Sequence, residues 1–397
     1  MASKDFGGKS GYTTHNSVRL IRGGKEYFEL LLRLIGEAKQ SIHLHVYIFD
    51  EDETGTLVAD ALIDAALRKV EVYLLFDGYA SQNLSESFIR KFFLAGIRFR
   101  MFEPLFLSTN FYFGRRMHHK VFVADTFHSL VGGINISNKY NKWNDDPPWL
   151  DWALYATGDI SVELLKILVR VWSRSHRQAR NYLAAHPPPG KVSNQCLVRI
   201  RRNDWVDRKI QITSSYFQVF RKAKSHITIM SSYFLPGLRF RQKMISASKR
   251  GVKIRLILAG TSDIKIAKHA ERYIYRWLFK HNIEIFEYHK SVLHGKIATA
   301  DNEWVTIGSY NVNNISAFAS LELNLDVLDK PFARSLTDRL NEIIEQDCRQ
   351  VTEADFNINF SIRDRLLQWT SYGLVRVLFY LFTFYFRQRS ANKRLWE

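Results

Sequence analysis

The sequence has few cysteines, no long apolar run and a deficit of acidic side chains. Its two cysteines, Cys196 and Cys348, exclude a disulfide-stabilised scaffold and are too few for a cysteine-based zinc site. The longest apolar stretch, residues 374–386, contains Arg376 and is shorter than the about 20 residues that a membrane-spanning helix needs. Because no apolar run precedes a small-residue cleavage site near the start, residues 1–15 are expected to form a flexible arm on a protein made in the cytosol.

The charge balance favours anionic partners. The 57 lysines and arginines outnumber the 39 aspartates and glutamates, which leaves a formal net charge of +18. Nucleic acid, acidic lipid headgroups and phosphorylated small molecules all fit such an excess. Apolar residues make up 46% of the chain, which excludes a disordered protein, and the length of 397 residues suggests two or three domains.

The two halves of the chain repeat one another. The first half carries matching segments at residues 38–39, 42–49, 70–76 and 96–99, and the second at 223–224, 227–234, 251–258 and 282–285. In residues 42–49 apolar positions alternate with polar ones, which is the period of a strand, and helical stretches lie between the strand-like runs. The pattern predicts an α/β fold of two lobes related by a pseudo-twofold axis, each with a mixed or mostly parallel sheet flanked by helices and with the active site between them.

A proline-rich segment at residues 186–190 separates the two halves, because it cannot continue a helix or a central strand. The expected domains are a first lobe at residues 16–188, a second lobe at 189–358 and a C-terminal tail at 359–397.

Each half contains one copy of an HxKxxxxD motif. The candidate catalytic residues are His118, Lys120 and Asp125 in the first copy and His294, Lys296 and Asp301 in the second. Downstream matches at equal spacing are Gly132, Gly133 and Asn135 in the first half and Gly308, Ser309 and Asn311 in the second. A single HxK occurs often by chance, but two copies with this many matching offsets do not.

The motif suits phosphoryl transfer. Residues i and i+2 of a strand point to one face, so each histidine projects together with its lysine, whereas His119 points to the other face and is expected to be structural. Lys120 and Lys296 would hold a phosphodiester and neutralise charge on its oxygens, with Asn135 and Asn311 as further phosphate-binding donors. One imidazole can attack phosphorus while the other acts as acid and then base, and no metal and no cofactor are required.

These residues resemble the phospholipase D superfamily and, within it, the bacterial cardiolipin synthases of the short type that lack transmembrane helices. The resemblance covers about residues 15–360 and rests on MHHKVFVADTFHSLVGGINIS, SSYFLP and LHGKIATADNEWVTIGSYNVNN followed by LELNLDV. It implies an enzyme that transfers a phosphatidyl group through a phospho-histidine from phosphatidylglycerol, or a similar donor, to the hydroxyl of phosphatidylglycerol. It also implies phospholipid substrates rather than nucleic acid.

The resemblance further implies that Asp151 and Glu322 orient the two imidazoles. It makes Asp125 and Asp301 more structural, ending a strand and holding the adjacent loop, and makes His118 the nucleophile and His294 the acid. The alternatives from the residues alone are a hydrolase of the same superfamily, acting on phospholipid or nucleic acid, and a membrane-binding scaffold with an inactive site.

The tail combines apolar residues, tryptophan and tyrosine with basic flanks, which is typical of a helix lying in a membrane interface. We therefore expect residues 359–397 to be an amphipathic segment that associates with an anionic membrane. The protein is accordingly expected at the cytoplasmic face of the inner membrane as a peripheral protein. The alternative is a helix docked on the second lobe or in a dimer contact.

Overall fold

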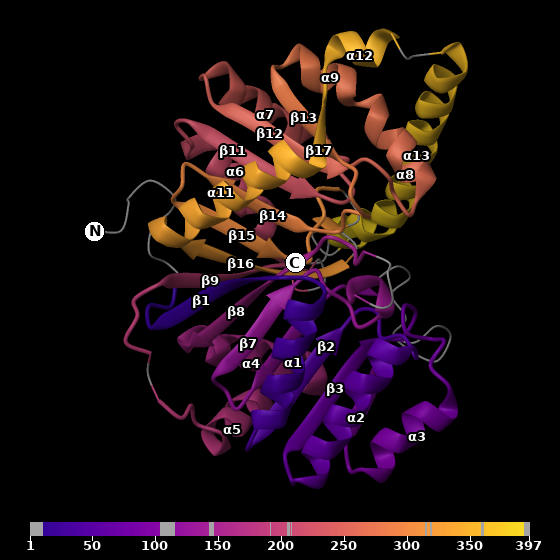
Figure 1. Cartoon of the computed structure of the whole chain (residues 1–397). Coiled ribbons are helices and arrows are strands. Elements are labelled where there is room, and N and C mark those ends of the chain that lie inside the picture. The colour runs from indigo at the N-terminus through magenta and orange to yellow at the C-terminus, as the bar shows by residue number, and fades with distance from the viewer. Residues whose placement is uncertain are drawn as a thin grey trace.

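The computed structural model describes residues 11–103, 116–142, 147–190, 192–204, 207, 209–313, 316–317, 320–358 and 361–392. Two β-sheets flanked by helices form two lobes that lie one above the other (Figure 1). The predicted α/β class and two-lobed architecture are confirmed.

The first sheet has seven strands. Their spatial order is β1 (Asn16–Arg22), β8 (Trp152–Gly158), β7 (His128–Gly132), β6 (Lys120–Ala124), β2 (Ser41–Val46), β3 (Glu71–Asp77) and β4 (Arg98–Phe102). Strands β2, β3 and β4 are parallel, whereas β6 runs antiparallel to β2, so the sheet is mixed.

The second sheet repeats this order and adds a strand at each edge. Its path is β10 (Lys209–Ile210), β9 (Leu197–Asp204), β16 (Ser320–Leu328), β15 (Trp304–Gly308), β14 (Lys296–Ala300), β11 (His226–Ser231), β12 (Lys253–Ala259), β13 (Ile283–Tyr288) and β17 (Cys348–Val351). The short strand β5 (Arg116–Met117) comes from the first lobe and pairs with β16 of the second. The strand order from β9 to β13 therefore matches that from β1 to β4, which is the pseudo-twofold relation that the repeat predicted.

Helices cover both sheets. Those of the first lobe are α1 (Lys25–Glu37), α2 (Glu53–Leu67), α3 (Glu86–Leu94), α4 (Asp159–Ser173) and α5 (His176–Ala185). Those of the second are α6 (Gln211–Lys222), α7 (Leu238–Lys249), α8 (Lys265–Tyr273), α9 (Tyr275–Lys280), α11 (Lys330–Asp347), α12 (Glu353–Ile358) and α13 (Ile362–Asn392).

One hydrophobic core runs through both lobes. Val121 and Leu154 of the first sheet belong to the same buried cluster as Val198 and Ile297 of the second. Helix α4 packs on its own sheet and on β9, and α11 packs on its own sheet and on β1. Because each lobe buries apolar surface against the other, the relative position of the two lobes is part of the folded core.

Strand β2 shows how the sequence pattern is realised. Ile42 and Leu44 enter the apolar cluster formed with α1 and α2, whereas the alternating His43 and His45 point to the opposite face of the sheet. There His43 stacks on Tyr73 with ring centroids 4.5 Å apart. His119 is also buried, with its ring stacked 6.2 Å from that of His45. These three histidines therefore belong to the packing of the first lobe.

Of residues 1–15, the predicted flexible arm, residues 1–10 lie outside the described part. Thr13 pairs with Val198 of the second lobe through two backbone hydrogen bonds of 2.8 and 3.2 Å. The guanidinium of Arg199 lies 4.5 Å above the ring of Tyr12. Tyr12 and Thr13 are therefore held on the second lobe, whereas His15 is bound to Asp159 of the first lobe.

Asp125 and Asp301 end the motif strands at the edge opposite to their histidines. Strand β6 begins at Lys120 and ends just before Asp125. Its five residues span roughly 16 Å, which separates Asp125 from the motif lysine and histidine. The Asp125 carboxylate accepts backbone N–H bonds from residues 39–41 at 2.7–3.0 Å, and Asp301 does the same for residues 224–226 at 2.7–3.0 Å. Both carboxylates thus hold a helix-to-strand loop, at the strand end away from the motif histidines and lysines.

The C-terminal tail forms α13, which lies beside α8 of the second lobe (Figure 1). Tyr372 stacks on Tyr273 with centroids 4.5 Å apart and accepts a hydrogen bond of 2.9 Å from Arg241. Val375 is buried against the same lobe. The first half of the tail is therefore docked. Within the described residues, no helix combines the length and the apolar character needed to cross a membrane.

Asp301→Ala should lower the stability of the fold without removing a catalytic group. Burial raises the pKa of the Asp301 carboxyl, but the N–H groups of residues 224–226 outweigh burial and lower it overall. The anchor therefore stabilises the native state above the unfolded pKa near 4, and its contribution is lost as pH falls through the lower folded pKa. We expect a loss of about 1–3 kcal/mol at pH 7 that shrinks below about pH 4, measured by denaturant unfolding.

The matched control is Asp338→Ala on the exposed side of α11. Equal stability losses in the two variants, or a loss in Asp301→Ala that persists at pH 3, would contradict the anchoring role.

Candidate active site

The two motif histidines sit directly before the central strands β6 and β14, where both strands reach the boundary between the lobes. The His118 N–H donates to the carbonyl of Leu321 at 3.0 Å, and the His294 N–H donates to that of Leu150 at 2.8 Å. Each histidine is thus bound by its backbone to the lobe that does not carry it. The edge concerned is the carboxyl end of the parallel strands, the usual position of ligand sites in α/β sheets.

The histidine side chains also contact the lobe that does not carry them. Nδ1 of His118 lies 2.9 Å from Oε2 of Glu322 on β16, and Nδ1 of His294 lies 2.5 Å from Oδ2 of Asp151, which directly precedes β8. Both carboxylates are buried. A carboxylate that accepts a hydrogen bond from Nδ1 keeps the ring proton on that nitrogen. The other nitrogen, Nε2, is then the one that can react.

The two motif lysines are buried in the same place. Lys120 donates to the carbonyl of His118 at 3.1 Å, and its ammonium lies 4.7 Å above the ring of Tyr47. Lys296 donates to Ser232 at 3.3 Å and lies 3.8 Å from the Asp151 carboxylate. Burial is the main cause of the lowered pKa of Lys120 and of His118, and the Lys296 ammonium of the other lobe adds to it in both cases.

Burial and positive charge shift these groups toward their neutral forms. Burial, followed by the Lys296 ammonium, lowers the pKa of His294 to about 4, although Asp151 opposes the shift. Burial also lowers the pKa of His118, against the effect of Glu322, and that of Lys296 to about 8. A bound anion would reverse these shifts, because negative charge beside the lysines favours their protonated forms. The site is therefore suited to an anionic ligand.

The residue that follows β7 in the first half differs from the residue that follows β15 in the second. A Cβ on Gly133 would lie 2.3 Å from Oδ1 of Asp151, so only glycine leaves room for that carboxylate. The equivalent Ser309 instead donates its hydroxyl to Glu322. The glycine makes space for one orienting carboxylate, and the serine binds the other.

The two predicted phosphate-binding asparagines are both buried, but their surroundings differ. The Asn135 side-chain oxygen accepts from the N–H of Ile48 at 3.1 Å, and its nitrogen donates to the hydroxyl of Tyr140 at 2.8 Å. Asn135 therefore has partners in its own lobe. The side-chain oxygen of Asn311 has no hydrogen-bond partner among the described residues.

Two residues of this site were missed in the sequence. Tyr140 and Trp149 place their rings 5.2 and 5.8 Å from that of His294. Tyr140 lies 22 residues after His118, and the residue 22 positions after His294 is Ser316. Continuing the comparison of the two repeats past Asn135 and Asn311 would have shown this difference. No such signal was available for Trp149, since the segments that lead to Asp151 and Glu322 differ in length.

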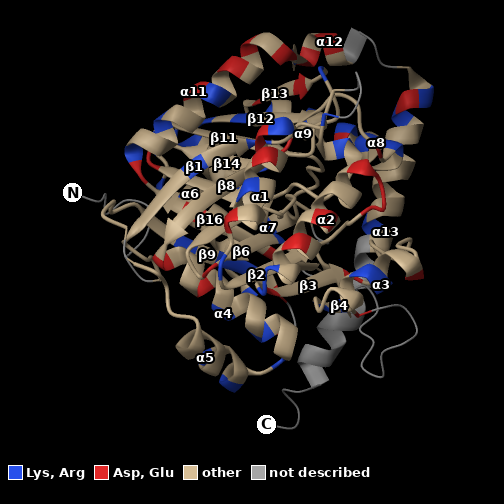
Figure 2. Ribbon diagram, turned by 60° about the horizontal axis from the view of Figure 1, so that its bottom comes forward, with Lys and Arg blue, Asp and Glu red and all other residues tan. Residues whose placement is uncertain are grey.

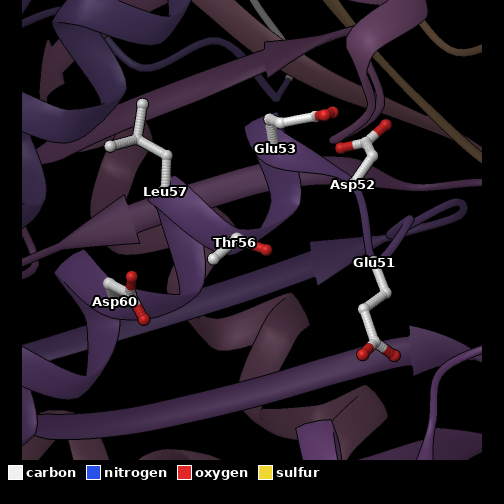
Figure 3. A pocket seen from close by; sticks show the side chains of 6 residues that line it. All are labelled: Glu51, Asp52, Glu53, Thr56, Leu57 and Asp60. Atoms are coloured by element: carbon white, nitrogen blue, oxygen red, sulfur yellow. The ribbon is translucent and has the colours of Figure 1, made fainter.

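A separate pocket of about 690 Å³ lies at the start of α2 (Figure 3). It is lined by Glu51, Asp52, Glu53, Thr56, Leu57 and Asp60. Its carboxylates would repel a phosphodiester, and Asp52 already caps α2 by accepting from the N–H of Gly55. This pocket is therefore not the candidate active site.

Comparison with known proteins identifies the family. The family described as "Cardiolipin synthase, PLD-like domain" matches residues 31–152 and 216–344. Cardiolipin synthase B of Escherichia coli (strain K12) is 34% identical over 358 residues, which cover 87% of this chain and 84% of that protein. The chain belongs to the cardiolipin synthase family. It is an enzyme of the phospholipase D superfamily.

More distant relatives agree with this assignment. Cardiolipin synthase 1 of Bacillus cereus is 28% identical over 366 residues, covering 89% of this chain and 70% of that protein. The crystal structure of phosphatidylserine synthase from Haemophilus influenzae Rd KW20 matches with a TM-score of 0.72, covering 92% of this chain and 95% of that chain at 12% identity. At that identity the structural likeness shows a shared fold alone.

Gly133→Ala should reduce phospholipid turnover by moving the Asp151 carboxylate away from His294. Loss of an orienting partner of this kind typically costs about 10- to 100-fold. Steady-state turnover is the measurement, with circular dichroism to confirm folding. Gly36→Ala in α1 is the control, because a Cβ there meets nothing within 4 Å. A fully active Gly133→Ala enzyme would show that the close approach of Asp151 is unimportant.

Proposed function

We propose that this protein is a phosphatidyltransferase that makes cardiolipin. It would move a phosphatidyl group from phosphatidylglycerol, or a similar phospholipid, to the hydroxyl of a phosphatidylglycerol. The observation that carries the proposal is the pair of crossed imidazole–carboxylate contacts beside two buried lysines, in a chain of the cardiolipin synthase family.

The first half-reaction uses Nε2 of His118 as the nucleophile. It attacks phosphorus, the bond from phosphorus to the leaving glycerol oxygen breaks, and that oxygen takes the proton carried by Nε2 of His294. Glu322 stabilises the positive charge that develops on the His118 ring, and Asp151 does so for His294 whenever it is protonated. The product of this step is a covalent phosphatidyl-histidine.

The second half-reaction returns the enzyme to its starting state. The acceptor hydroxyl attacks phosphorus, its proton passes to His294, and the phosphorus–nitrogen bond to His118 breaks. Lys120 and Lys296 neutralise the charge on the non-bridging phosphate oxygens in both steps. These two ammonium groups supply the positive charge that the reaction needs, so the proposal includes no metal ion.

A phospholipase D-type hydrolase is the alternative within the same chemistry, because water can replace the acceptor alcohol at the covalent intermediate. Mass spectrometry of the lipids formed from phosphatidylglycerol vesicles separates the two. We expect a four-chain product and glycerol, and turnover that EDTA leaves unchanged. Phosphatidic acid as the sole product would establish the hydrolase instead.

His118→Ala and His294→Ala test the residues in that assay. Each should lower the rate by at least the roughly 10²- to 10⁴-fold that acid–base assistance supplies. His128→Ala is the control, since His128 lies on β7 and contacts Tyr155 away from the site. Near-normal turnover in either motif variant would refute the mechanism.

We propose further that the outward face of α13 and α8 lies against an anionic membrane. Ile362, Leu366, Trp369 and Val377 of α13 are each more than half exposed although they are large and apolar. Lysines and arginines accompany them along α8 and at the start of α13 (Figure 2). An exposed apolar face with tryptophan and basic neighbours is the composition of a membrane-interface helix.

Substituting Leu366, Trp369 and Val377 together by glutamine tests this surface. These side chains face outward, so the change should spare the fold while lowering co-sedimentation with phosphatidylglycerol liposomes by at least about 10-fold. Leu94→Gln on α3 is the control, because Leu94 is 78% exposed on the first lobe. Unchanged liposome binding, or a change in solution mass instead, would show that this face is not the membrane surface.

A further inference from the structure

The two half-sites are not equivalent, although the fold that carries them repeats. Tyr140 lies 22 residues after His118, and the residue at the same offset from His294 is Ser316. Trp149 lies two residues before Asp151, and the residue two before Glu322 is Ser320. The first lobe therefore offers two aromatic rings where the second offers two serines.

Both aromatic rings of the first lobe are directed at the histidine of the second lobe. The hydroxyl of Tyr140 lies 3.4 Å from Nε2 of His294, and its ring is 5.4 Å from that of Trp149. Tyr140 is buried, so its hydroxyl needs a partner for its hydrogen as well as for its oxygen.

The hydrogen bonds around Tyr140 specify where its proton goes. Because the side-chain oxygen of Asn135 accepts from the backbone of Ile48, its NH₂ group is the part that faces Tyr140 and donates to the phenolic oxygen. Nδ1 of His294 lies 2.5 Å from the Asp151 carboxylate and 2.8 Å from the Lys296 ammonium. In the neutral ring that donates its Nδ1 proton to Asp151, Nε2 is an acceptor, and the Tyr140 hydroxyl 3.4 Å away is then the donor.

His118 has no equivalent contact at Nε2. Glu322 holds its Nδ1, and Tyr47 meets the ring edge-on at 4.7 Å. Within the described part of the chain, the His118 side chain hydrogen-bonds through Nδ1 and not through Nε2. A lone pair that attacks phosphorus must be unoccupied, whereas an acid–base nitrogen benefits from a hydroxyl, which can donate to its neutral form and accept from its protonated form.

We propose that Tyr140, held by Asn135, is a positioning residue that commits His294 to proton transfer and leaves His118 as the imidazole that attacks phosphorus. This inference rests on the proposed function and assigns the two histidines from the asymmetry of their surroundings. Asn135 acts through Tyr140 in this arrangement, and Asn311 remains the asparagine with a free acceptor oxygen in the site.

Tyr140→Phe tests the assignment when two donors with different leaving groups are compared. Release of glycerol from phosphatidylglycerol requires a proton, whereas release of nitrophenolate from phosphatidyl-p-nitrophenol does not. In single turnovers we expect the variant to release glycerol at least about 10-fold more slowly than wild type. General acid–base catalysis as a whole supplies a rate gain of roughly 10²- to 10⁴-fold, and the variant should lose part of it. Release of nitrophenolate should change less than about twofold, because that step needs no acid.

Asn135→Ala is the second variant and should show the same dependence on the leaving group with a smaller loss. Tyr155→Phe is the matched control. The Tyr155 hydroxyl lies 2.7 Å from Nδ1 of His128 on β7, so this variant also removes a tyrosine hydroxyl that contacts a histidine. Equal losses on both donors in Tyr140→Phe would overturn the proposal, since a role in phosphate binding or in folding does not depend on the leaving group. Wild-type rates on both donors would overturn it as well.

A second measurement does not depend on activity. Carbethoxylation of imidazole nitrogens by diethyl pyrocarbonate, located by peptide mass spectrometry, should label His118 faster than His294 in the wild type. Tyr140→Phe should speed the labelling of His294 several-fold and leave that of His118 unchanged. Unchanged labelling of His294 would count against the contact. If the wild type releases neither leaving group, the proposed function fails, and the labelling alone then decides the role of Tyr140.

Discussion

Each half of the site is completed by the other half of the molecule. The imidazole of His118 needs Glu322, and that of His294 needs Asp151, so neither lobe can build an oriented histidine by itself. The backbone bonds from the two histidines to Leu321 and Leu150 hold the same crossing. The relative position of the lobes is set by the apolar core that they share, and a sub-ångström adjustment there would reach both imidazoles.

These contacts between the lobes also explain how the fold accommodates several buried charged side chains. Two ammonium groups and two carboxylates are buried together, and isolation of any one of them would be costly. Together they compensate one another, and burial is the first cause of the lowered pKa of His294 and of Lys296. A bound anion would favour the protonated forms of both groups, so anion binding and protonation of His294 are expected to be linked.

The two lobes share one strand order, but the side chains that contact the imidazoles differ between them. Gly133 makes room for Asp151, whereas Ser309 donates to Glu322. Tyr140 reaches Nε2 of His294, whereas Ser316 stands at the equivalent offset. A reaction with one nucleophile and one acid requires such a difference, because identical surroundings would give both histidines the same reactivity.

The sequence by itself determined the α/β class, the two-lobed architecture and the family, because strand periodicity, the internal repeat and the motif spacing are local properties. It also pointed to Asp151 and Glu322, through resemblance. Only the tertiary structure decided that these carboxylates cross between lobes and that Asp125 and Asp301 lie at the far end of their strands. It also decided that Tyr12, Thr13 and the start of α13 pack on the second lobe and that Tyr140 contacts His294. The hydrogen bonds among these contacts join residues 75 to 204 positions apart, and the packing of the shared core, rather than any local pattern, brings them together.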